Sequence, residues 1–253
     1  MERYIRFAVA EGAEWGLFED GKINKITGNP AAGYESTGQY YELSAVRLLA
    51  PVVPSKIICV GLNYREHVKE SQSADEVPKE PVLFLKPPSA VIGPGAKIKY
   101  PEMADRVDYE AELGIVIGKE CRHVAEVEAE DYIFGFTCGN DVTARDLQKK
   151  DKQWTRAKGF DTFCPVGPWV ISNLKYDDLL IESYLNGELR QSAHTSDMIF
   201  SVPFLISFVS KIMTLNPGDL MLTGTPSGIG PMQPGDRVEV RIEGIGSLAN
   251  DVA

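Results

Sequence analysis

The chain has 253 residues, of which 43% are hydrophobic and 25% are charged, which is ordinary for a soluble globular protein. This length allows one large domain or two unequal ones. The formal net charge of −10 argues against nucleic acid as a partner, because neutralising phosphates requires clustered Lys and Arg.

Membrane insertion and secretion are not expected either. The longest apolar run, residues 198–213, is interrupted by serines, a proline and a lysine, and it is too short to span a bilayer. The first six residues lack the apolar core of a signal peptide. The four cysteines are widely spaced and form no Cys-x-x-Cys pair, which favours reduced, mostly buried thiols in a cytoplasmic protein over a zinc site.

Residues 1–54 are predicted to form a small β-rich domain without a catalytic cluster. Short strands are expected at residues 4–10, 15–20 and 23–26, and residues 28–37 are loop by composition. The Pro-rich segment 51–55 is the best candidate for a linker to the rest of the chain, residues 55–253.

After a predicted buried strand at residues 56–61 comes a polar segment that contains His67 and Glu70. If this segment is helical, the two residues share one face, where the carboxylate can hold and polarise the imidazole. A surface helix with ordinary charges is the alternative. The polar run 69–80 is expected to be a mobile loop, which beside a site can serve as a lid.

The most informative stretch is residues 107–118, where apolar residues alternate as in a strand. Glu110 and Glu112 lie two apart, so both carboxylates leave the same face of that strand. Two adjacent like charges repel, and burying them requires a partner such as a divalent cation. A solvated strand face is the alternative. Asp141 follows an apolar run, where it is either a third ligand or a helix cap.

Three further features of the sequence point to the same region. Arg145 and Gln148 are three apart and are expected to share a helical face. Lys158 lies among small and aromatic residues instead of in a charge run, which indicates a specific target, although surface lysines are commoner. Thr225 lies in a Gly- and hydroxyl-rich loop, residues 224–230, whose donors could hold a substrate carboxylate.

The remaining pattern is dominated by strands and turns. A hairpin is predicted at Asn186-Gly187, a helix at residues 202–213, and strands at residues 220–223 and 238–242. The 23 glycines and 16 prolines also favour a strand-rich fold with many turns.

Five motifs, in this order and spacing, resemble those of the fumarylacetoacetate hydrolase superfamily. The likeness runs from about Lys56 to the C-terminus and is closest to the small acylpyruvate hydrolase and oxaloacetate decarboxylase type of member. The motifs are Asn63-Tyr64-x-x-His67-x-x-Glu70, Asp108-Tyr109-Glu110-x-Glu112-Leu113, Asn140-Asp141-x-Thr143-Ala144-Arg145-Asp146, Trp154-x-x-Ala157-Lys158-x-Phe160-x-x-x-Cys164-Pro165 and Leu222-Thr223-Gly224-Thr225-Pro226-x-Gly228.

The resemblance implies a strand-rich α+β fold with layered sheets around a mixed β-roll, few helices, and a homodimer. It implies that Glu110, Glu112 and Asp141 bind a divalent metal, Mg²⁺ or Mn²⁺, with Ca²⁺ also possible. Three carboxylates suit such a hard ion and leave positions for substrate. A 2-oxo acid can chelate the ion through its carboxylate and keto oxygens, and the ion would stabilise the enolate formed when a bond beyond C3 breaks.

The resemblance also assigns roles to the other residues. His67 and Glu70 match the pair that activates water, and Lys158 matches a catalytic lysine. Arg145, Gln148 and Thr225 match positions that line the substrate pocket. Lys86 lies in a similar Phe-x-Lys-Pro run, where a structural role at a strand end is equally consistent with the pattern.

These roles predict a metal-dependent hydrolase that cleaves a C–C bond in a 3-acylpyruvate-like β-diketo acid, or that decarboxylates oxaloacetate, with a small 2-oxo acid as substrate. The alternative is an isomerase or decarboxylase of the 2-hydroxyhepta-2,4-diene-1,7-dioate type in aromatic catabolism. A non-catalytic metal-binding protein is a third hypothesis, although His67, Glu70 and Lys158 are all present.

Overall fold

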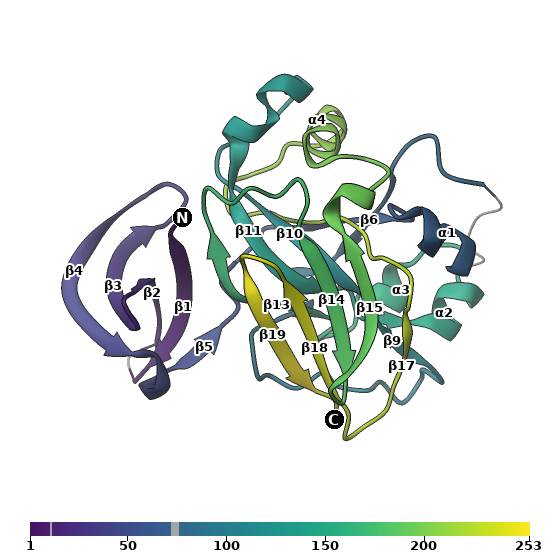
Figure 1. Cartoon of the computed structure of the whole chain (residues 1–253), viewed down its shortest axis with the longest axis horizontal. Helices are drawn as coiled ribbons and strands as arrows, with labels where there is room; N and C mark the ends of the chain where they lie inside the picture. The colour runs from purple at the N-terminus through teal and green to yellow at the C-terminus, as the bar shows by residue number, and fades with distance from the viewer. Residues whose placement is uncertain (11, 72–75) are drawn as a thin grey trace.

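The structure is a computed structural model that describes residues 1–10, 12–71 and 76–253. Strands dominate it and helices are few, which confirms the predicted strand-rich α+β class (Figure 1). The α-helices of the described residues are α1 (Arg65–Ser71), α2 (Arg145–Lys150), α3 (Thr155–Lys158) and α4 (Val202–Ile212). Short 3₁₀ turns are η1 (Leu43–Ala45), η2 (Pro88–Ala90), η3 (Glu126–Tyr132) and η4 (Thr195–Asp197).

One large sheet runs through the molecule from end to end. In spatial order its strands are β4 (Gly33–Glu42), β3 (Lys22–Asn29), β2 (Gly12–Glu19), β1 (Arg3–Val9), β13 (Cys164–Ile171), β11 (Ile133–Asn140), β10 (Ala111–Ile117), β16 (Leu220–Leu222), β6 (Ile57–Gly61) and β7 (Val82–Lys86). Two short strands join it at the side: β5 (Arg47–Leu49) pairs with β1, and β8 (Val91–Ile92) pairs with β13.

Two smaller sheets pack around the large one. The first contains β12 (Thr143–Ala144), β9 (Val107–Tyr109) and β17 (Gly230–Met232). The second contains β15 (Glu188–His194), β14 (Leu180–Leu185), β18 (Arg237–Ile242) and β19 (Gly246–Asp251), and it lies in front of β10 and β11 in Figure 1.

The main hydrophobic core fills the space between the large sheet and the four-stranded sheet. It includes Leu113 and Ile115 of β10, Ile181 of β14 and Val240 of β18, and the apolar face of α4 closes it. These side chains are fully or almost fully buried, so β10 is a rigid central strand. The strand that carries the predicted metal ligands is therefore held firmly in place.

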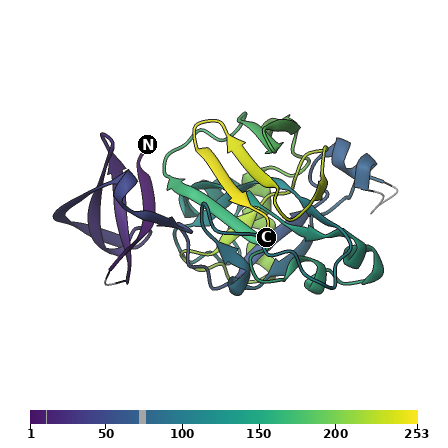
Figure 2. The same ribbon diagram turned by 90° about the horizontal axis from the view of Figure 1, so that it is seen from below.

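The N-terminal strands form a lobe at one end of the molecule (Figure 2). They have a small core of their own around Ile5, Phe7 and Ile23, yet β1 pairs with β13 and so extends the large sheet. The boundary at residue 54 stays a prediction.

The predicted loop at residues 28–37 is wrong, because β3 continues to Asn29 and β4 begins at Gly33. The polar composition of β4 suggested a loop, but antiparallel pairing along β3 satisfies its backbone, and most of its side chains face solvent.

Several local predictions are confirmed. Asn186 and Gly187 both have positive φ, and they join β14 to β15 in a tight hairpin. Ser201 caps α4 by accepting a hydrogen bond from the backbone of Phe204. Strand β19 was not predicted, because it is polar and forms by pairing along β18.

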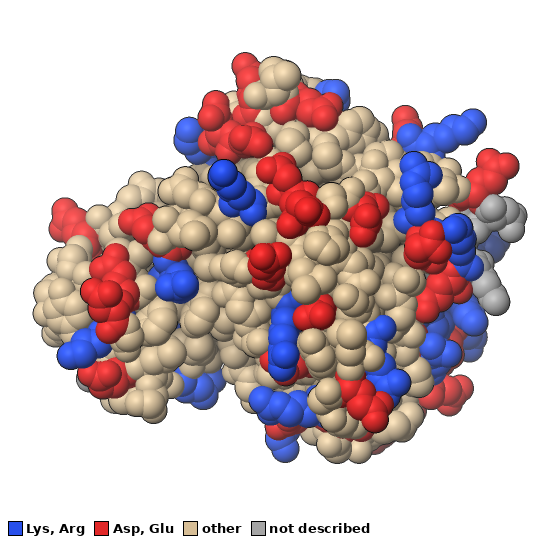
Figure 3. All heavy atoms as spheres, viewed as in Figure 1, with Lys and Arg blue, Asp and Glu red and all other residues tan. Residues whose placement is uncertain are grey.

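Acidic and basic side chains are intermingled over the face of the molecule shown in Figure 3. No helix in the described part of the chain is both long and apolar enough to cross a membrane.

Candidate active site

The predicted strand at residues 107–118 is broken at Glu110. Residues before the break form β9 in the three-stranded sheet, and residues after it form β10 in the large sheet. At the break the backbone N–H of Glu110 donates to a side chain instead of to a neighbouring strand. Its acceptor is Oδ1 of Asn140, at 3.0 Å. The break places Glu110 where the two sheets meet. Glu112 follows two residues later in β10.

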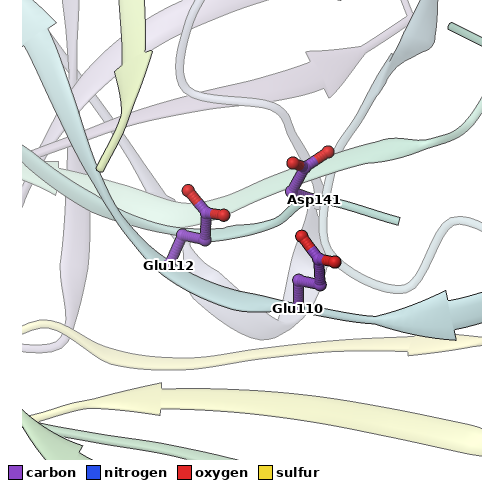
Figure 4. A group of neighbouring side chains, drawn as sticks. All are labelled: Glu110, Glu112 and Asp141. Atoms are coloured by element: carbon purple, nitrogen blue, oxygen red, sulfur yellow. The ribbon is translucent and has the colours of Figure 1, made fainter. Parts of the chain in front are cut away.

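Glu110, Glu112 and Asp141 form a compact buried cluster (Figure 4). One carboxylate oxygen from each lies within 4.8 Å of those of the others, although Asp141 comes from a different segment, directly after β11. The backbone N–H of Asp141 donates to the carbonyl of Glu110 at 2.9 Å, which ties the two segments together. The solvated strand face considered above is excluded, because Glu110 is 4% exposed and Glu112 is 1% exposed.

Asp141 is not a helix cap. Helix α2 begins four residues later, its N-cap is Ala144, and no side chain caps it. The Asp141 carboxylate instead accepts from two buried lysines: Lys86 on Oδ1 at 2.5 Å and Lys158 on Oδ2 at 2.6 Å.

Lys158 is a buried site residue and not a surface lysine, since it is 2% exposed at the end of α3. Its ammonium donates to Oε2 of Glu110 at 2.8 Å as well as to Asp141. Burial alone would lower the pKa of Lys158, but the charges of Asp141 and Glu110 raise it above its ordinary value. Burial would likewise raise the pKa of Glu110, yet Lys158 and then Arg145 hold it below its ordinary value.

Glu112 is different, because no basic side chain of the described residues forms an ion pair with it. Its Oε2 accepts a hydrogen bond from the backbone N–H of Gly224 at 2.7 Å. Burial, followed by the nearby Asp141 and Glu110 charges, raises the pKa of Glu112 well above its ordinary value. A buried carboxylate in this position requires a cation or a proton, so the residues present fit a hard divalent ion held by three carboxylates.

Gly224 shows why a glycine is needed beside the cluster. Its φ is +100°, and a Cβ there would lie 2.7 Å from Cβ of Asn63. The glycine lets the backbone approach closely enough to donate to Glu112. The loop 224–230 thus uses backbone donors on the protein's own carboxylates, a use the sequence did not reveal.

His67 and Glu70 lie on one face of α1, as the spacing predicts, and Nδ1 of His67 is 3.3 Å from Oε2 of Glu70. His67 is only 5% exposed, which excludes an ordinary surface helix. Both carboxylate oxygens of Glu70 also accept from the backbone N–H of Gly228 at 3.1 Å. Burial opposes the charge of Glu70, but the hydrogen bonds from His67 and Gly228 hold its pKa below the ordinary value.

Arg145 and Gln148 share a face of α2 and are hydrogen-bonded to each other at 2.6 Å. The guanidinium also donates to Glu110 at 2.5 Å and to Asp108 at 2.9 Å. Arg145, predicted to bind substrate, is therefore in direct contact with the acidic cluster. Thr225 donates to the carbonyl of Ala111 at 2.9 Å, between the two glutamates.

One cavity brings these predicted residues together. Its polar lining consists of His67, Glu110, Glu112, Asp141, Arg145, Gln148, Lys158 and Thr225. Its apolar lining includes Val60, Leu62, Phe84 and Trp154. Glu70 reaches this cavity through its contact with His67. The expected lid, residues 69–80, includes residues 72–75, which lie outside the described residues.

Two residues support the cavity from behind: Gln191, which the sequence reasoning missed, and Asn63, which the first motif contains without a role being predicted for it. Gln191 of β15 accepts from the N–H of Ala111 at 3.0 Å and donates to Thr225 at 2.8 Å. Asn63 donates to the carbonyls of Phe200 and Thr223 at 3.1 and 2.7 Å. These partners lie between 34 and 160 residues away along the chain, so only the folded topology brings them together, and no local pattern reveals these contacts.

Comparison with known proteins follows the same division of the chain. Residues 56–253 match the family model "Fumarylacetoacetate (FAA) hydrolase C-terminal", and residues 2–51 match "Rv2993c-like, N-terminal". The chain is 47% identical to Protein Rv2993c of Mycobacterium tuberculosis, covering 98% of this chain and 94% of that one. It is 45% identical to the oxaloacetate tautomerase YisK of Bacillus subtilis, covering 84% of this chain and 75% of that one.

Solved structures show the same fold. A 2-hydroxyhepta-2,4-diene-1,7-dioate isomerase from Mycobacterium marinum superimposes with a TM-score of 0.93 at 45% identity, covering 100% of this chain and 98% of that one. A fumarylpyruvate hydrolase from Pseudomonas aeruginosa, solved with Mn²⁺ and pyruvate, gives a TM-score of 0.76 at 32% identity, covering 82% and 91%. With a family model matching most of its length, the chain belongs to the fumarylacetoacetate hydrolase family.

Proposed function

We propose that this protein is a divalent-metal-dependent enzyme that moves a proton at C3 of a small 2-oxo acid, with oxaloacetate as a substrate for keto–enol tautomerisation. The observation that carries the proposal is a single cavity lined by His67 and the three buried carboxylates. The tautomerase of Bacillus subtilis and the isomerase of Mycobacterium marinum support it, because both names describe proton transfers without C–C cleavage.

Glu110, Glu112 and Asp141 would hold the ion, which we propose to be Mg²⁺ or Mn²⁺, with Ca²⁺ as a weaker fit. When bound, the ion would act as a Lewis acid that withdraws electron density from the 2-oxo oxygen. Lys158 and Arg145 place positive charge in the same cavity, and they would bind the carboxylates of the substrate. Gln148 and Thr225 supply neutral hydrogen-bonding groups there.

His67 is the proposed general base. The ionised Glu70 accepts the Nδ1–H of His67, which fixes the tautomer and leaves Nε2 as the nitrogen that can take a proton. His67 removes a proton from C3, the electron pair of the C–H bond becomes the C2=C3 bond, and the keto oxygen receives a proton to give the enol. The reverse sequence regenerates the keto form.

A second candidate reaction is hydrolysis of a 3-acylpyruvate. The P. aeruginosa fumarylpyruvate hydrolase favours it, because that structure holds pyruvate together with Mn²⁺. Here His67 would take a proton from the attacking water, and the bond between C3 and the acyl carbon would break with pyruvate leaving as its enolate. Decarboxylation of oxaloacetate would pass through the same enolate.

We also propose a homodimer in the cytoplasm, with neither nucleic acid nor membrane as partner. The four buried, free cysteines support a reducing compartment. Sedimentation equilibrium measures the mass in solution, and a monomeric mass would contradict the dimer.

A substrate panel tests the proposed function. Oxaloacetate enol decay, pyruvate release from acetylpyruvate, and isomerisation of a 2-hydroxydienedioate are each followed with Mn²⁺ and with EDTA. We expect Mn²⁺-dependent turnover of oxaloacetate, reduced by about 10²-fold or more in His67→Asn. His194→Asn is the matched control, because His194 also pairs with a carboxylate, Asp178 at 2.9 Å, but lies exposed and outside the cavity lining.

Two results would contradict the proposal. One is the absence of turnover on all three substrate classes while Mn²⁺ is shown to be bound, which would leave a non-catalytic metal-binding protein. The other is equal loss of activity in the His67 and His194 variants. Turnover of acetylpyruvate alone would instead select the hydrolase.

A further inference from the structure

Lys86 is a buried lysine outside the cavity lining that contacts the acidic cluster. It is the last residue of β7 and is 1% exposed. Its ammonium donates to Oδ1 of Asp141 at 2.5 Å and to the carbonyl of Val142 at 3.1 Å. One amino group therefore binds both the side chain of Asp141 and the backbone of the next residue.

The two oxygens of Asp141 have different surroundings. Oδ2 accepts from Lys158, which lines the cavity, whereas Oδ1 accepts from Lys86, which does not. Lys86 thus lies behind the carboxylate, away from the space that a substrate or ion would enter. The oxygen that Lys86 does not bind, Oδ2, is the one that contacts a residue of the cavity lining, Lys158.

The segment around Asp141 has few other side-chain supports. The hydroxyl of Thr143 donates to the carbonyl of Asp141 at 2.8 Å, and the N–H of Asp141 donates to Glu110. These bonds fix the backbone but leave the carboxylate free to rotate about its side-chain bonds. Among the described residues, only Lys86 and Lys158 bind the carboxylate itself.

We propose that Lys86 is a positioning residue that orients Asp141 for divalent-cation binding, in addition to balancing its charge. The inference rests on the proposed metal-dependent function. The two roles predict opposite outcomes when the lysine is removed. A lysine that only balances charge repels the cation, so its loss should tighten binding; a lysine that orients a ligand should weaken binding when lost.

Titration of the EDTA-treated, dialysed protein with Mn²⁺, followed by the EPR signal of free Mn²⁺, measures directly whether loss of the lysine weakens or tightens Mn²⁺ binding. We expect Lys86→Met to weaken Mn²⁺ binding about tenfold or more, the loss typical of residues that support metal ligands. Lys158→Met should bind Mn²⁺ as tightly as the wild type or more tightly, because Lys158 lines the cavity and places its positive charge against oxygens of two proposed ligands, Glu110 and Asp141.

A matched control comes from the residue just before β6, the strand that pairs with β7. Lys56 pairs with the buried Asp219 and lies outside the cavity lining, so Lys56→Met tests the loss of a lysine–aspartate pair without an effect on Mn²⁺ affinity. Thermal unfolding of all three variants checks that they fold. If Lys86→Met does not fold, Lys86→Gln, which keeps a polar group there, is measured with the same expectation.

The proposal is overturned if the Lys86 variant binds Mn²⁺ as tightly as the wild type or more tightly. It is also overturned if Lys158→Met weakens binding as much as Lys86→Met does. Mn²⁺ binding by the wild type without turnover would refute the proposed reaction and leave this inference intact. A wild type that does not bind Mn²⁺ would overturn both.

Discussion

Glu112 offers the sharpest test of how the acidic cluster is balanced. It is buried, lies next to Glu110 and Asp141, and has no basic ion-pair partner among the described residues. We consider the change Glu112→Gln, which keeps the shape of the side chain and removes its charge.

The structure sets the magnitude of the effect without metal. Two unit charges within 4.8 Å of each other repel by about 3 kcal/mol at an effective dielectric constant of about 20. Glu112 can avoid this repulsion by binding a proton, since its pKa is raised. In EDTA, the free energy of unfolding of Glu112→Gln should therefore exceed that of the wild type by between 0 and about 3 kcal/mol.

With metal bound, the wild type should be more stable than Glu112→Gln. Mn²⁺ at 100 times its dissociation constant stabilises a protein that binds it only when folded by about 2.7 kcal/mol. For a chain of this size that is roughly 5–10 °C in Tm. Glu112→Gln loses a ligand and should show almost no Mn²⁺-dependent shift.

Urea and thermal unfolding in EDTA and in Mn²⁺ measure both differences. Glu128→Gln, which removes an exposed carboxylate outside the acidic cluster, is the control and should behave as the wild type in both conditions. The reasoning is refuted if Mn²⁺ stabilises Glu112→Gln as much as the wild type. It is also refuted if the variant is clearly less stable than the wild type in EDTA.

Three other predictions follow from single contacts. Burial opposes the charge of Asp219, but hydrogen bonds from Lys56 and other donors hold its pKa below the ordinary value. The ionised carboxylate therefore stabilises the fold above about pH 4, and this stabilisation is lost as the pH falls. Asp219→Asn should thus lower the unfolding free energy by about 3 kcal/mol at pH 7 and by less near pH 3, a difference that urea unfolding at both pH values would reveal. Gly61→Ala would place a Cβ 2.9 Å from the ring of Trp154 in the cavity wall, so KM should rise several-fold with Tm little changed; an unchanged KM would contradict this. Glu70→Gln should lower kcat about 10- to 100-fold without changing Mn²⁺ affinity, and equal losses in both would argue that Glu70 supports the metal site instead.

Much of the site could be anticipated because its residues lie in local patterns. Glu110 and Glu112 share a strand face by period two, and His67 and Glu70 share a helix face by spacing, and both patterns survive folding. Lys158 was notable because it lacked neighbouring charges, and it is in fact buried.

What the sequence could not show depends on contacts between distant segments. The break at Glu110 arises because β9 and β10 pair with different partners. Gln191 reaches Ala111 from another sheet, 80 residues away. The strand β4 looked like a loop because its polar side chains face solvent and its stability comes from backbone pairing with β3.

The most direct test of the central claim is a crystal structure with Mn²⁺ and oxalate, a stable mimic of the pyruvate enolate, located by anomalous scattering. We predict one Mn²⁺ bound by an oxygen from each of Glu110, Glu112 and Asp141, with oxalate chelating it on the side of Lys158 and His67. A Mn²⁺ peak elsewhere, or oxalate bound away from these residues, would contradict the account.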